Sequence, residues 1–216
     1  MSLQTVLAEV EPGWYAGDDG DLPDPALVRR ARGSALGERI LARWLLQGHA
    51  AALLAPQPGR TVAEAAVRWP RAKLQPFLRD VGVLSMAPAI RAEIGRDAVR
   101  RLKQLLGNSY LLALDRTVWD GRVPAETMLA LGAELAAALK PAATPGTDAA
   151  ADGAALYALL ERRGRAELRA WAHEHEPALG EWATLLQPPE DAAPAVLPAR
   201  QVQLLHEHHL ARARAA

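Results

Sequence analysis

Apolar residues recur at steps of three and four positions along nearly the whole of this 216-residue chain. That spacing places them on one face of an α-helix, whereas the strict alternation typical of a β-strand is rare. Prolines interrupt the pattern and divide it into separate segments. The pattern therefore predicts an all-α fold, a single irregular helical domain of about eight helices.

Start and stop signals set the bounds of the expected helices. Asp24-Pro25 offers an N-cap followed by a first-turn proline, so a first long helix is expected over residues 25–55, with a break near Gly33–Gly37. Asp97 is expected to cap a helix that carries a wide apolar stripe as far as Ala113. The other expected helices cover residues 61–69, 74–83, 124–140, 154–163, 165–176, 179–186 and 199–213.

Composition along the chain divides it into four parts. Residues 1–24 form an acidic N-terminal segment, and residues 25–187 form the helical domain. Within that domain, residues 141–153 contain few bulky side chains and are expected to be a flexible loop. Residues 188–198 form a Pro-rich linker, and residues 199–216 form a C-terminal helix.

Charge and cysteine content narrow the functional classes. The 25 Lys and Arg residues balance the 25 Asp and Glu residues, so no nucleic-acid partner is expected. No cysteine is present, which excludes disulfides, thiolate metal sites and a cysteine nucleophile. Residues 1–26 contain acidic residues but no Lys or Arg, unlike the start of a signal peptide. We therefore expect a cytoplasmic protein.

No direct insertion into a membrane is expected either. The longest weakly polar stretch in the middle of the chain, residues 129–139, is interrupted by Glu134. It is also shorter than the roughly 20 apolar residues that a membrane-spanning helix needs. We therefore expect this stretch to form a buried helix.

The sequence contains no motif that carries catalysis. It has no Gly-Lys-Ser or Gly-Lys-Thr for a phosphate-binding loop, and the glycines around Ser34 do not have the Gly-x-Ser-x-Gly spacing of a serine elbow. We therefore predict no enzyme activity, no catalytic residue and no cofactor.

Histidine clusters offer the main alternative, a metal-binding enzyme or regulator. Residues two apart on a helix point in different directions, so His173 and His175 cannot share a metal ion, whereas His206 and His209 lie on one face. Two ligands do not complete a tetrahedral site, and a composite site would need both clusters to meet. Solvated or capping histidines near helix C-termini are the simpler interpretation.

An uneven distribution of charge points to partner binding. Basic residues outnumber acidic ones between Arg71 and Arg116, and Arg91 lies within this stretch. Arg96, Arg100 and Lys103 have i, i+4, i+7 spacing and are expected to form one basic face that could meet an acidic partner. The alternative is a set of solvated helix faces without a binding role.

Tryptophan is the commonest aromatic residue of this chain, and it is frequent both in cores and at interfaces. We expect most of the six to lie in the core, Trp44 in particular, because it falls in the apolar register of the first long helix. Trp14 lies in the acidic opening near Asp18 and Asp19, so these three residues are candidates for partner contacts.

One stretch of the chain resembles a known family, the K-subunits of type III secretion systems. The shared features are an apolar segment, an arginine before an isoleucine, and a helix ending in Leu-Gly with an aromatic residue three positions later. In this chain they are carried by Val83–Ile94, Val99, Leu102, Leu105-Leu106-Gly107, Tyr110 and Ala113-Leu114. The resemblance covers about 83–114 and no other part of the chain.

The resemblance implies a non-enzymatic accessory protein of the cytoplasmic sorting platform. Such a protein bridges the cytoplasmic domain of the inner-membrane ring subunit to the pod or C-ring protein that carries the ATPase assembly. It would be cytoplasmic and would lie at the inner membrane only through a protein partner. A helical chaperone or regulator unrelated to secretion is a third interpretation, and the identity of the partner would distinguish it.

Overall fold

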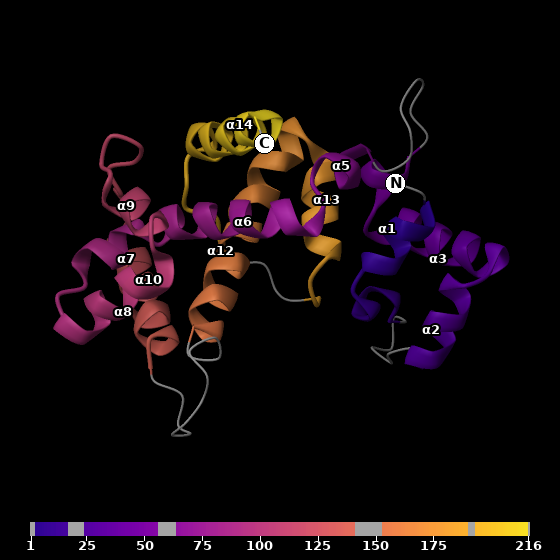
Figure 1. Cartoon of the computed structure of the whole chain (residues 1–216), viewed down its shortest axis with the longest axis horizontal. Helices are drawn as coiled ribbons and strands as arrows, with labels where there is room; N and C mark the ends of the chain where they lie inside the picture. The colour runs from indigo at the N-terminus through magenta and orange to yellow at the C-terminus, as the bar shows by residue number, and fades with distance from the viewer. Residues whose placement is uncertain (1–2, 17–23, 56–63, 141–152, 190–192, 216) are drawn as a thin grey trace. The chain divides into compact units, whose positions relative to one another are not determined.

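The computed structural model describes residues 3–16, 24–55, 64–140, 153–189 and 193–215, and Figure 1 shows the whole chain. The described residues form 13 α-helices and one short 3₁₀ helix, and they contain no strand. This confirms the all-α fold class. The helices are more numerous than the roughly eight expected from periodicity, because short helices and internal breaks are weakly marked in the sequence.

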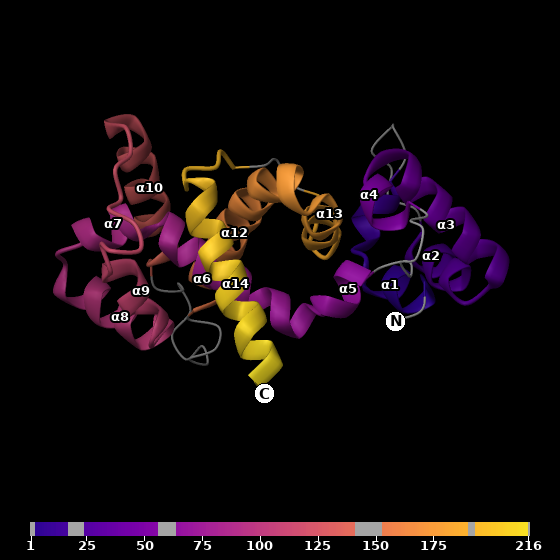
Figure 2. The same cartoon turned by 90° about the horizontal axis from the view of Figure 1, so that it is seen from above.

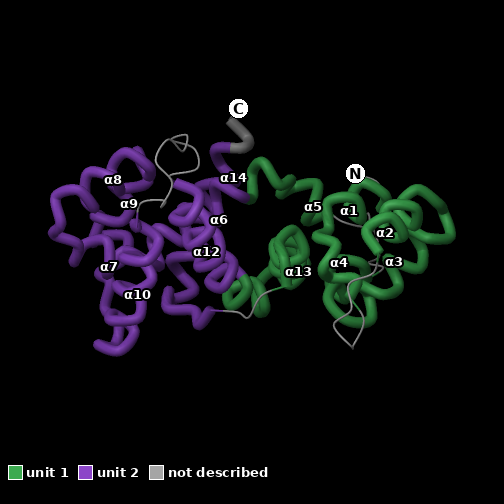
Figure 3. Tube along the Cα trace, turned by 90° about the horizontal axis from the view of Figure 1, so that it is seen from below, with its two compact units in different colours: residues 1–74, 169–192 green, residues 75–168, 193–216 purple. Residues whose placement is uncertain are grey.

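Two compact units make up the chain, where periodicity alone suggested one domain. Unit 1 contains residues 1–74 and 169–192, and unit 2 contains residues 75–168 and 193–216 (Figure 3). The boundary between the units falls within two helices, α6 (Arg71–Ser85) and α12 (Ala154–His175).

Unit 1 contains the N-terminal helices and one segment from near the C-terminus. Besides parts of α6 and α12, its elements are α1 (Leu3–Glu9), η1 (Pro12–Tyr15), α2 (Pro25–Arg32), α3 (Ala35–Gly48), α4 (Ala51–Leu54), α5 (Glu64–Arg68) and α13 (Pro177–Leu185). Helices α2 and α3 lie side by side (Figures 1 and 2). Part of the acidic opening is folded into this unit, because Val6, Leu7 and Tyr15 are buried.

Unit 2 contains the remaining helices. Besides parts of α6 and α12, these are α7 (Ala87–Ala92), α8 (Arg96–Leu106), α9 (Ser109–Leu114), α10 (Ala125–Ala138) and α14 (Ala199–Ala215). Every residue from Val81 to Ile90 is buried, so the end of α6 and the start of α7 form the centre of the unit. The wide apolar stripe expected to mark the most buried helix lies next to this centre, on α8 and α9.

The first long helix is divided at Gly33-Ser34, within the region where a break was expected. Ser34 has extended backbone and its Oγ accepts a hydrogen bond from the Gly37 amide at 3.1 Å, which caps α3. Asp24 caps α2 by accepting a hydrogen bond from the Ala26 amide at 2.9 Å. A further break separates α3 from the short helix α4.

The helix expected to start at Asp97 differs from the observed one at both ends. Gly95 occupies the N-cap position of α8, and Asp97 lies in its first turn without capping it, so the predicted cap is wrong by two residues. Gly107 has φ of +53°, a left-handed conformation that ends α8 before α9 begins. One expected helix is therefore two.

In α12 the prediction is wrong in the opposite sense. Two helices were expected there, but α12 runs unbroken through Gly164. The glycine is present because α6 and α12 cross very closely. A Cβ at Gly164 would lie 1.9 Å from the Leu78 carbonyl oxygen, and a Cβ at Gly82 would lie 2.0 Å from the Leu160 carbonyl oxygen. Glycine here permits helix packing and does not end a helix.

The Pro-rich segment before α14 is anchored to unit 2 by a buried carboxylate. Glu167 of α12 accepts hydrogen bonds from the backbone amides of Val196 and Leu197, each at 2.9 Å, and from Ser85 Oγ at 2.8 Å. Burial raises the pKa of Glu167, and the three donors together with the charge of Arg163 oppose that rise. Residues 193–198 are thus bonded to the helical core of unit 2.

Helix α14 packs onto unit 2 through an apolar face. Val202, Leu205 and His206 are buried, and the rings of His206 and His209 contact Phe77 of α6 with centroids 5.9 and 5.3 Å apart. None of the helices in the described parts of the chain is long and apolar enough to cross a bilayer.

Candidate functional site

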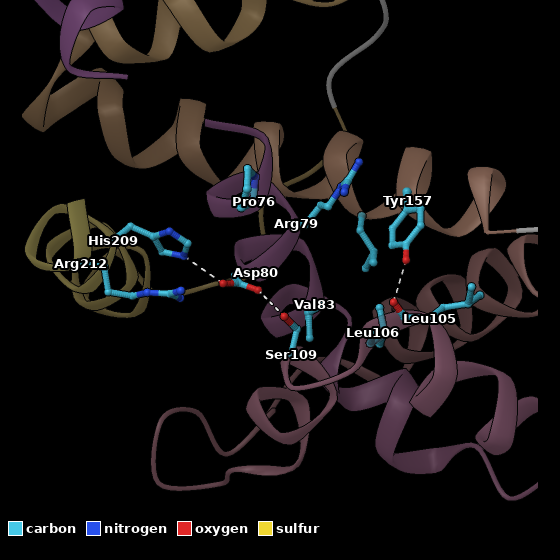
Figure 4. A pocket seen from close by; sticks show the side chains of 11 residues that line it. Pro76, Arg79, Asp80, Val83, Leu105, Leu106, Ser109, Tyr157, His209 and Arg212 are labelled. Carbon is cyan, nitrogen blue, oxygen red and sulfur yellow. Dashed lines mark hydrogen bonds and ion pairs between the residues drawn. The ribbon is translucent and has the colours of Figure 1, made fainter. Parts of the chain in front are cut away.

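A pocket of about 290 Å³ opens on unit 2 between helices α6, α8, α9, α12 and α14. Apolar side chains form part of its wall, and polar side chains, most of them titratable, form the rest (Figure 4). The residues that line it are Pro76, Arg79, Asp80, Val83, Leu105, Leu106, Ser109, Tyr157, Leu160, His209 and Arg212. Its size is near the lower end for small-molecule sites.

Asp80 is the central polar group of this pocket. Its Oδ1 accepts a hydrogen bond from Ser109 Oγ at 2.6 Å, and its Oδ2 lies 2.9 Å from His209 Nε2 (Figure 4). Burial acts to raise the pKa of Asp80, but the hydrogen bonds from His209 and Ser109 and the charges of His209 and Arg212 outweigh it. The pKa of Asp80 is therefore held below its usual value.

The contacts of Asp80 join three helices, and they do not activate Ser109 as a nucleophile. In a Ser-His-Asp triad the histidine accepts the serine proton, whereas here Ser109 and His209 each bond to a different oxygen of Asp80. Asp80 of α6 thereby ties α9 and α14 to the core of unit 2. The serine, aspartate and histidine are neighbours without forming a catalytic relay.

The polar side chains on the opposite wall of the pocket also have interaction partners within unit 2. Arg79 Nε lies 2.7 Å from Glu161 Oε1, and its guanidinium lies 4.5 Å from the centre of the Tyr157 ring. The Tyr157 hydroxyl donates to the Leu105 carbonyl oxygen at 2.7 Å. The polar side chains on this side of the pocket therefore satisfy one another or the backbone.

The histidine clusters expected as the alternative metal site have other roles. His175 Nδ1 lies 2.8 Å from the Trp171 carbonyl oxygen, and the two rings stack with centroids 5.0 Å apart, while His173 is exposed. His206 and His209 do lie on one face of α14, as expected, but that face is turned toward Phe77. Among the described residues no three His, Asp or Glu side chains form a metal-binding group.

Helix α8 carries the predicted basic face. Arg96, Arg100 and Lys103 are all exposed, while Leu102 and Leu106 are buried. The Lys103 Nζ lies 5.7 Å from the centre of the Tyr110 ring. Within the described parts of the chain no carboxylate forms an ion pair with any of the three basic side chains.

Arg91, a further predicted partner-binding residue, is engaged inside unit 2. Its guanidinium donates hydrogen bonds to the carbonyl oxygens of Ala113 at 2.6 Å, Trp119 at 2.8 Å and Asp120 at 2.9 Å. A fourth, longer bond reaches the Asp115 carbonyl oxygen at 3.4 Å. These bonds hold the segment that follows α9, so Arg91 differs from the three basic residues of α8, which are exposed and form no ion pair among the described residues.

Trp14 is half-buried and bonded within unit 1. Its indole Nε1 donates to the Gln187 carbonyl oxygen at 2.7 Å, and its ring makes an edge contact with His49 at 4.8 Å between centroids. Asp18 and Asp19, the acidic candidates next to it, lie outside the described residues. Trp14 thus retains a partly exposed edge while its polar group is satisfied.

The expectation that Trp44 lies in the core is wrong. Trp69, Trp119, Trp171 and Trp182 are buried, but Trp44 is 44 % exposed. The buried face of α3 is formed by Gly37, Leu41 and Leu45. Each of these residues directly follows one of the exposed apolar residues Leu36, Ile40 and Trp44 in the sequence.

Sequence reasoning missed an apolar stripe on the exposed side of α3. Leu36 and Ile40 are 63 % and 59 % exposed and follow the same four-residue spacing as Trp44. The signal was present as two adjacent apolar stripes on one helix, but the sequence could not show which of them is buried.

Two buried or half-buried acidic residues were also missed. Glu167 anchors residues 196–197, as described above, and Glu181 of α13 caps α4. The Glu181 carboxylate accepts hydrogen bonds from the amides of Ala52 at 3.0 Å and Leu53 at 2.6 Å. Neither acid has a local sequence signal, because each partner lies far away along the chain.

No family model, curated protein or solved structure matches this chain. The residues with the K-subunit resemblance, 83–114, form the end of α6 together with α7, α8 and α9.

Proposed function

We propose that this chain is a non-enzymatic adaptor of a type III secretion sorting platform. It would bridge the cytoplasmic domain of the inner-membrane ring subunit to the pod or C-ring protein. It would act in the cytoplasm and lie at the inner membrane only through its protein partner. No catalytic residue or cofactor is part of this proposal.

The observation that carries the proposal is the basic face of α8. Three exposed cations at i, i+4, i+7 spacing have no ion-pair partner in the described part of the chain, while the other side of the same helix is buried. Such a face speeds association with an acidic surface and fixes its orientation. The same helix lies within the stretch that resembles the K-subunit family.

The contents of the pocket are consistent with an adaptor. Its serine, aspartate and histidine hold helices together, and Arg79 and Tyr157 bond to neighbouring groups. These interactions give unit 2 a rigid frame on which α8 is displayed. A rigid frame reduces the ordering cost that a binding surface must overcome.

A binding experiment with purified proteins tests the proposal. The full-length chain is titrated with the cytoplasmic domain of the ring subunit and, separately, with the pod protein. Reversing the three charges in the variant R96E/R100E/K103E is expected to slow association with one of the two partners by about tenfold or more and to weaken its dependence on salt. Circular dichroism should be unchanged, because all three side chains are exposed.

A second charge-reversed variant serves as the matched control. Arg116, Arg122 and Arg200 are also exposed residues of unit 2 but lie outside α8. R116E/R122E/R200E makes the same change in net charge and should leave the association rate within about twofold, if local charge and not overall charge matters. Failure of the unmodified chain to bind either partner would contradict the adaptor function itself.

A further inference from the structure

Helix α3 of unit 1 carries a second surface that is suited to binding. Leu36, Ile40 and Trp44 are 63 %, 59 % and 44 % exposed and form one stripe along the helix. Single exposed apolar residues are common, but three large ones in register make a continuous patch. We propose that this face of α3 is a docking surface for an acidic amphipathic helix of a partner protein.

The stripe is not the core-facing side of α3. The neighbouring stripe, Gly37, Leu41 and Leu45, is buried within unit 1. A Cβ at Gly37 would lie 2.3 Å from the Ala31 carbonyl oxygen, so the end of α2 is in close contact with the start of α3 on that side. Because the buried side is already packed, α3 cannot rotate to bury the exposed stripe without losing that contact.

The aromatic end of the stripe is held in place before any partner binds. Trp44 Nε1 donates to the Trp14 carbonyl oxygen at 3.3 Å, and Trp14 is in turn bonded to the Gln187 carbonyl oxygen at 2.7 Å. The polar atom of Trp44 is thereby satisfied while much of its ring stays exposed. A preoriented tryptophan at the edge of an apolar stripe is a favourable binding anchor.

Charge next to the stripe indicates which kind of helix would bind. Arg39 and Arg43 are exposed and lie one turn apart, directly beside Ile40 and Trp44 on α3. Arg39 donates to the Ala35 carbonyl oxygen at 3.2 Å, and neither arginine forms an ion pair in the part of the chain that the structure describes. A partner with carboxylates flanking an apolar stripe would complement both features.

The dimensions favour a helix as the occupant. Leu36 and Trp44 are eight positions apart, which corresponds to about 12 Å along the axis. A partner helix of about three turns would cover this length with apolar residues at i, i+3, i+4 and i+7. Two arginines and three apolar residues are a small site for an anionic membrane, which is usually bound by longer amphipathic helices.

This inference deepens the proposed function, because a bridging adaptor needs two separate surfaces. The α8 face belongs to unit 2, and the α3 face belongs to unit 1. The inference rests on the proposed function only for that bridging role. The binding of an acidic helix at α3 is itself independent of the secretion assignment.

The experiment uses the full-length chain and a hydrocarbon-stapled, dye-labelled peptide of about 14 residues, long enough for roughly four helical turns. It carries leucines on one face and glutamates elsewhere, and binding is followed by fluorescence anisotropy. The double variant L36S/I40S and the charge-reversed variant R39E/R43E are each expected to raise the Kd about tenfold or more. A peptide with lysines in place of the glutamates should bind at least about tenfold more weakly.

Leu129 provides a matched control, because it is an exposed leucine on α10 of unit 2, outside the proposed surface. Leu129→Ser should change the Kd by less than about twofold, since a residue outside an interface contributes little to binding. The α8 variant R96E/R100E/K103E should also bind the peptide normally, which separates failure of this inference from failure of the proposed function.

Several results would overturn the inference. Equal binding of the acidic and basic peptides would contradict the role of Arg39 and Arg43, and equal losses of affinity in Leu129→Ser and L36S/I40S would contradict the role of the apolar stripe. Concentration-dependent dimerisation in sedimentation, abolished by L36S/I40S, would assign the face to a second copy of the chain. Binding of the chain to phosphatidylserine vesicles but not to the peptide would assign it to a membrane.

Discussion

Gly164 of α12 lies directly against the backbone of Leu78 in α6, so that a Cβ at Gly164 would be 1.9 Å from the Leu78 carbonyl oxygen. One turn away, Gly82 faces the Leu160 carbonyl oxygen in the same manner. The two contacts are reciprocal, with a glycine of each helix against the backbone of the other. The centre of unit 2 therefore depends on the absence of two side chains.

Alanine at either glycine should destabilise the protein strongly. Gly164→Ala forces a methyl group into backbone atoms that cannot move aside as a flexible side chain could, so α6 and α12 must separate. We expect the free energy of unfolding to fall by about 3 kcal/mol or more, at or beyond the upper end of typical overpacking costs. Urea denaturation followed by circular dichroism measures the change.

Gly132 of α10 is the matched control for this substitution. It is also a helical glycine, but a Cβ there would meet no atom within 4 Å. Gly132→Ala should raise the free energy of unfolding by about 0.5–1 kcal/mol, because alanine favours helix. Similar effects at Gly132 and Gly164 would show that the close crossing is absent.

Loss of the Glu167 carboxylate should release the segment before α14. In Glu167→Gln, one oxygen becomes an NH₂ group that cannot accept the backbone N–H of Val196 or Leu197. We expect a loss of about 1–3 kcal/mol in the free energy of unfolding. Amide hydrogen exchange at Val196 and Leu197 should accelerate about tenfold or more.

Glu126→Gln is the control for this effect, because Glu126 is an exposed residue of α10. It should leave exchange at Val196 and Leu197 unchanged. If Glu167→Gln also left those two amides protected, the anchoring role of Glu167 would be refuted.

Stability in acid should depend on Asp80. Because its folded pKa lies below the usual value, the carboxylate stabilises the fold at neutral pH, and this contribution is lost as the pH falls below about 4 and through the folded pKa. Asp80→Asn should cost about 1–3 kcal/mol at pH 7 and much less at pH 3. Urea denaturation across this pH range tests the sign.

Asp97→Asn provides the comparison for the pH series, since Asp97 is exposed in the first turn of α8. The difference in the free energy of unfolding between Asp97→Asn and the unmodified chain should not become smaller at low pH. A loss of stability in Asp80→Asn that is the same at pH 3 and pH 7 would argue against the hydrogen bonds of Asp80 with His209 and Ser109 as the source of the stabilisation.

Arg91 should behave as a structural residue and not as a contact for a partner. Arg91→Ala removes the donors to the carbonyl oxygens of Ala113, Trp119 and Asp120, so we expect a loss of about 2–4 kcal/mol in the free energy of unfolding. Arg100→Ala, on the exposed face of α8, should change that free energy by less than about 0.5 kcal/mol. A stable Arg91→Ala protein with impaired partner binding would instead support Arg91 as a partner contact.

The sequence by itself determined the features that depend on neighbours a few positions apart. Apolar spacing predicted the all-α class, and Asp24 with Pro25 predicted the start of α2. The break before α3 was expected from its glycines, and Ser34 caps the new helix locally. The spacing of Arg96, Arg100 and Lys103 likewise predicted three side chains that prove to be exposed together. Helical periodicity and caps are local interactions, so they can be read without knowing the tertiary contacts.

Only the tertiary structure decided what depends on residues far apart in the chain. It showed that Gly164 lies inside a helix because Leu78 crosses there, and that α3 buries the stripe of Leu41 while exposing that of Ile40. It also showed that the guanidinium of Arg91 holds backbone carbonyl oxygens of its own unit. Each of these three features depends on which segments far apart in the sequence come into contact in the fold. Helical periodicity does not reveal such contacts, because the spacing of residues along a helix is the same whichever face is buried.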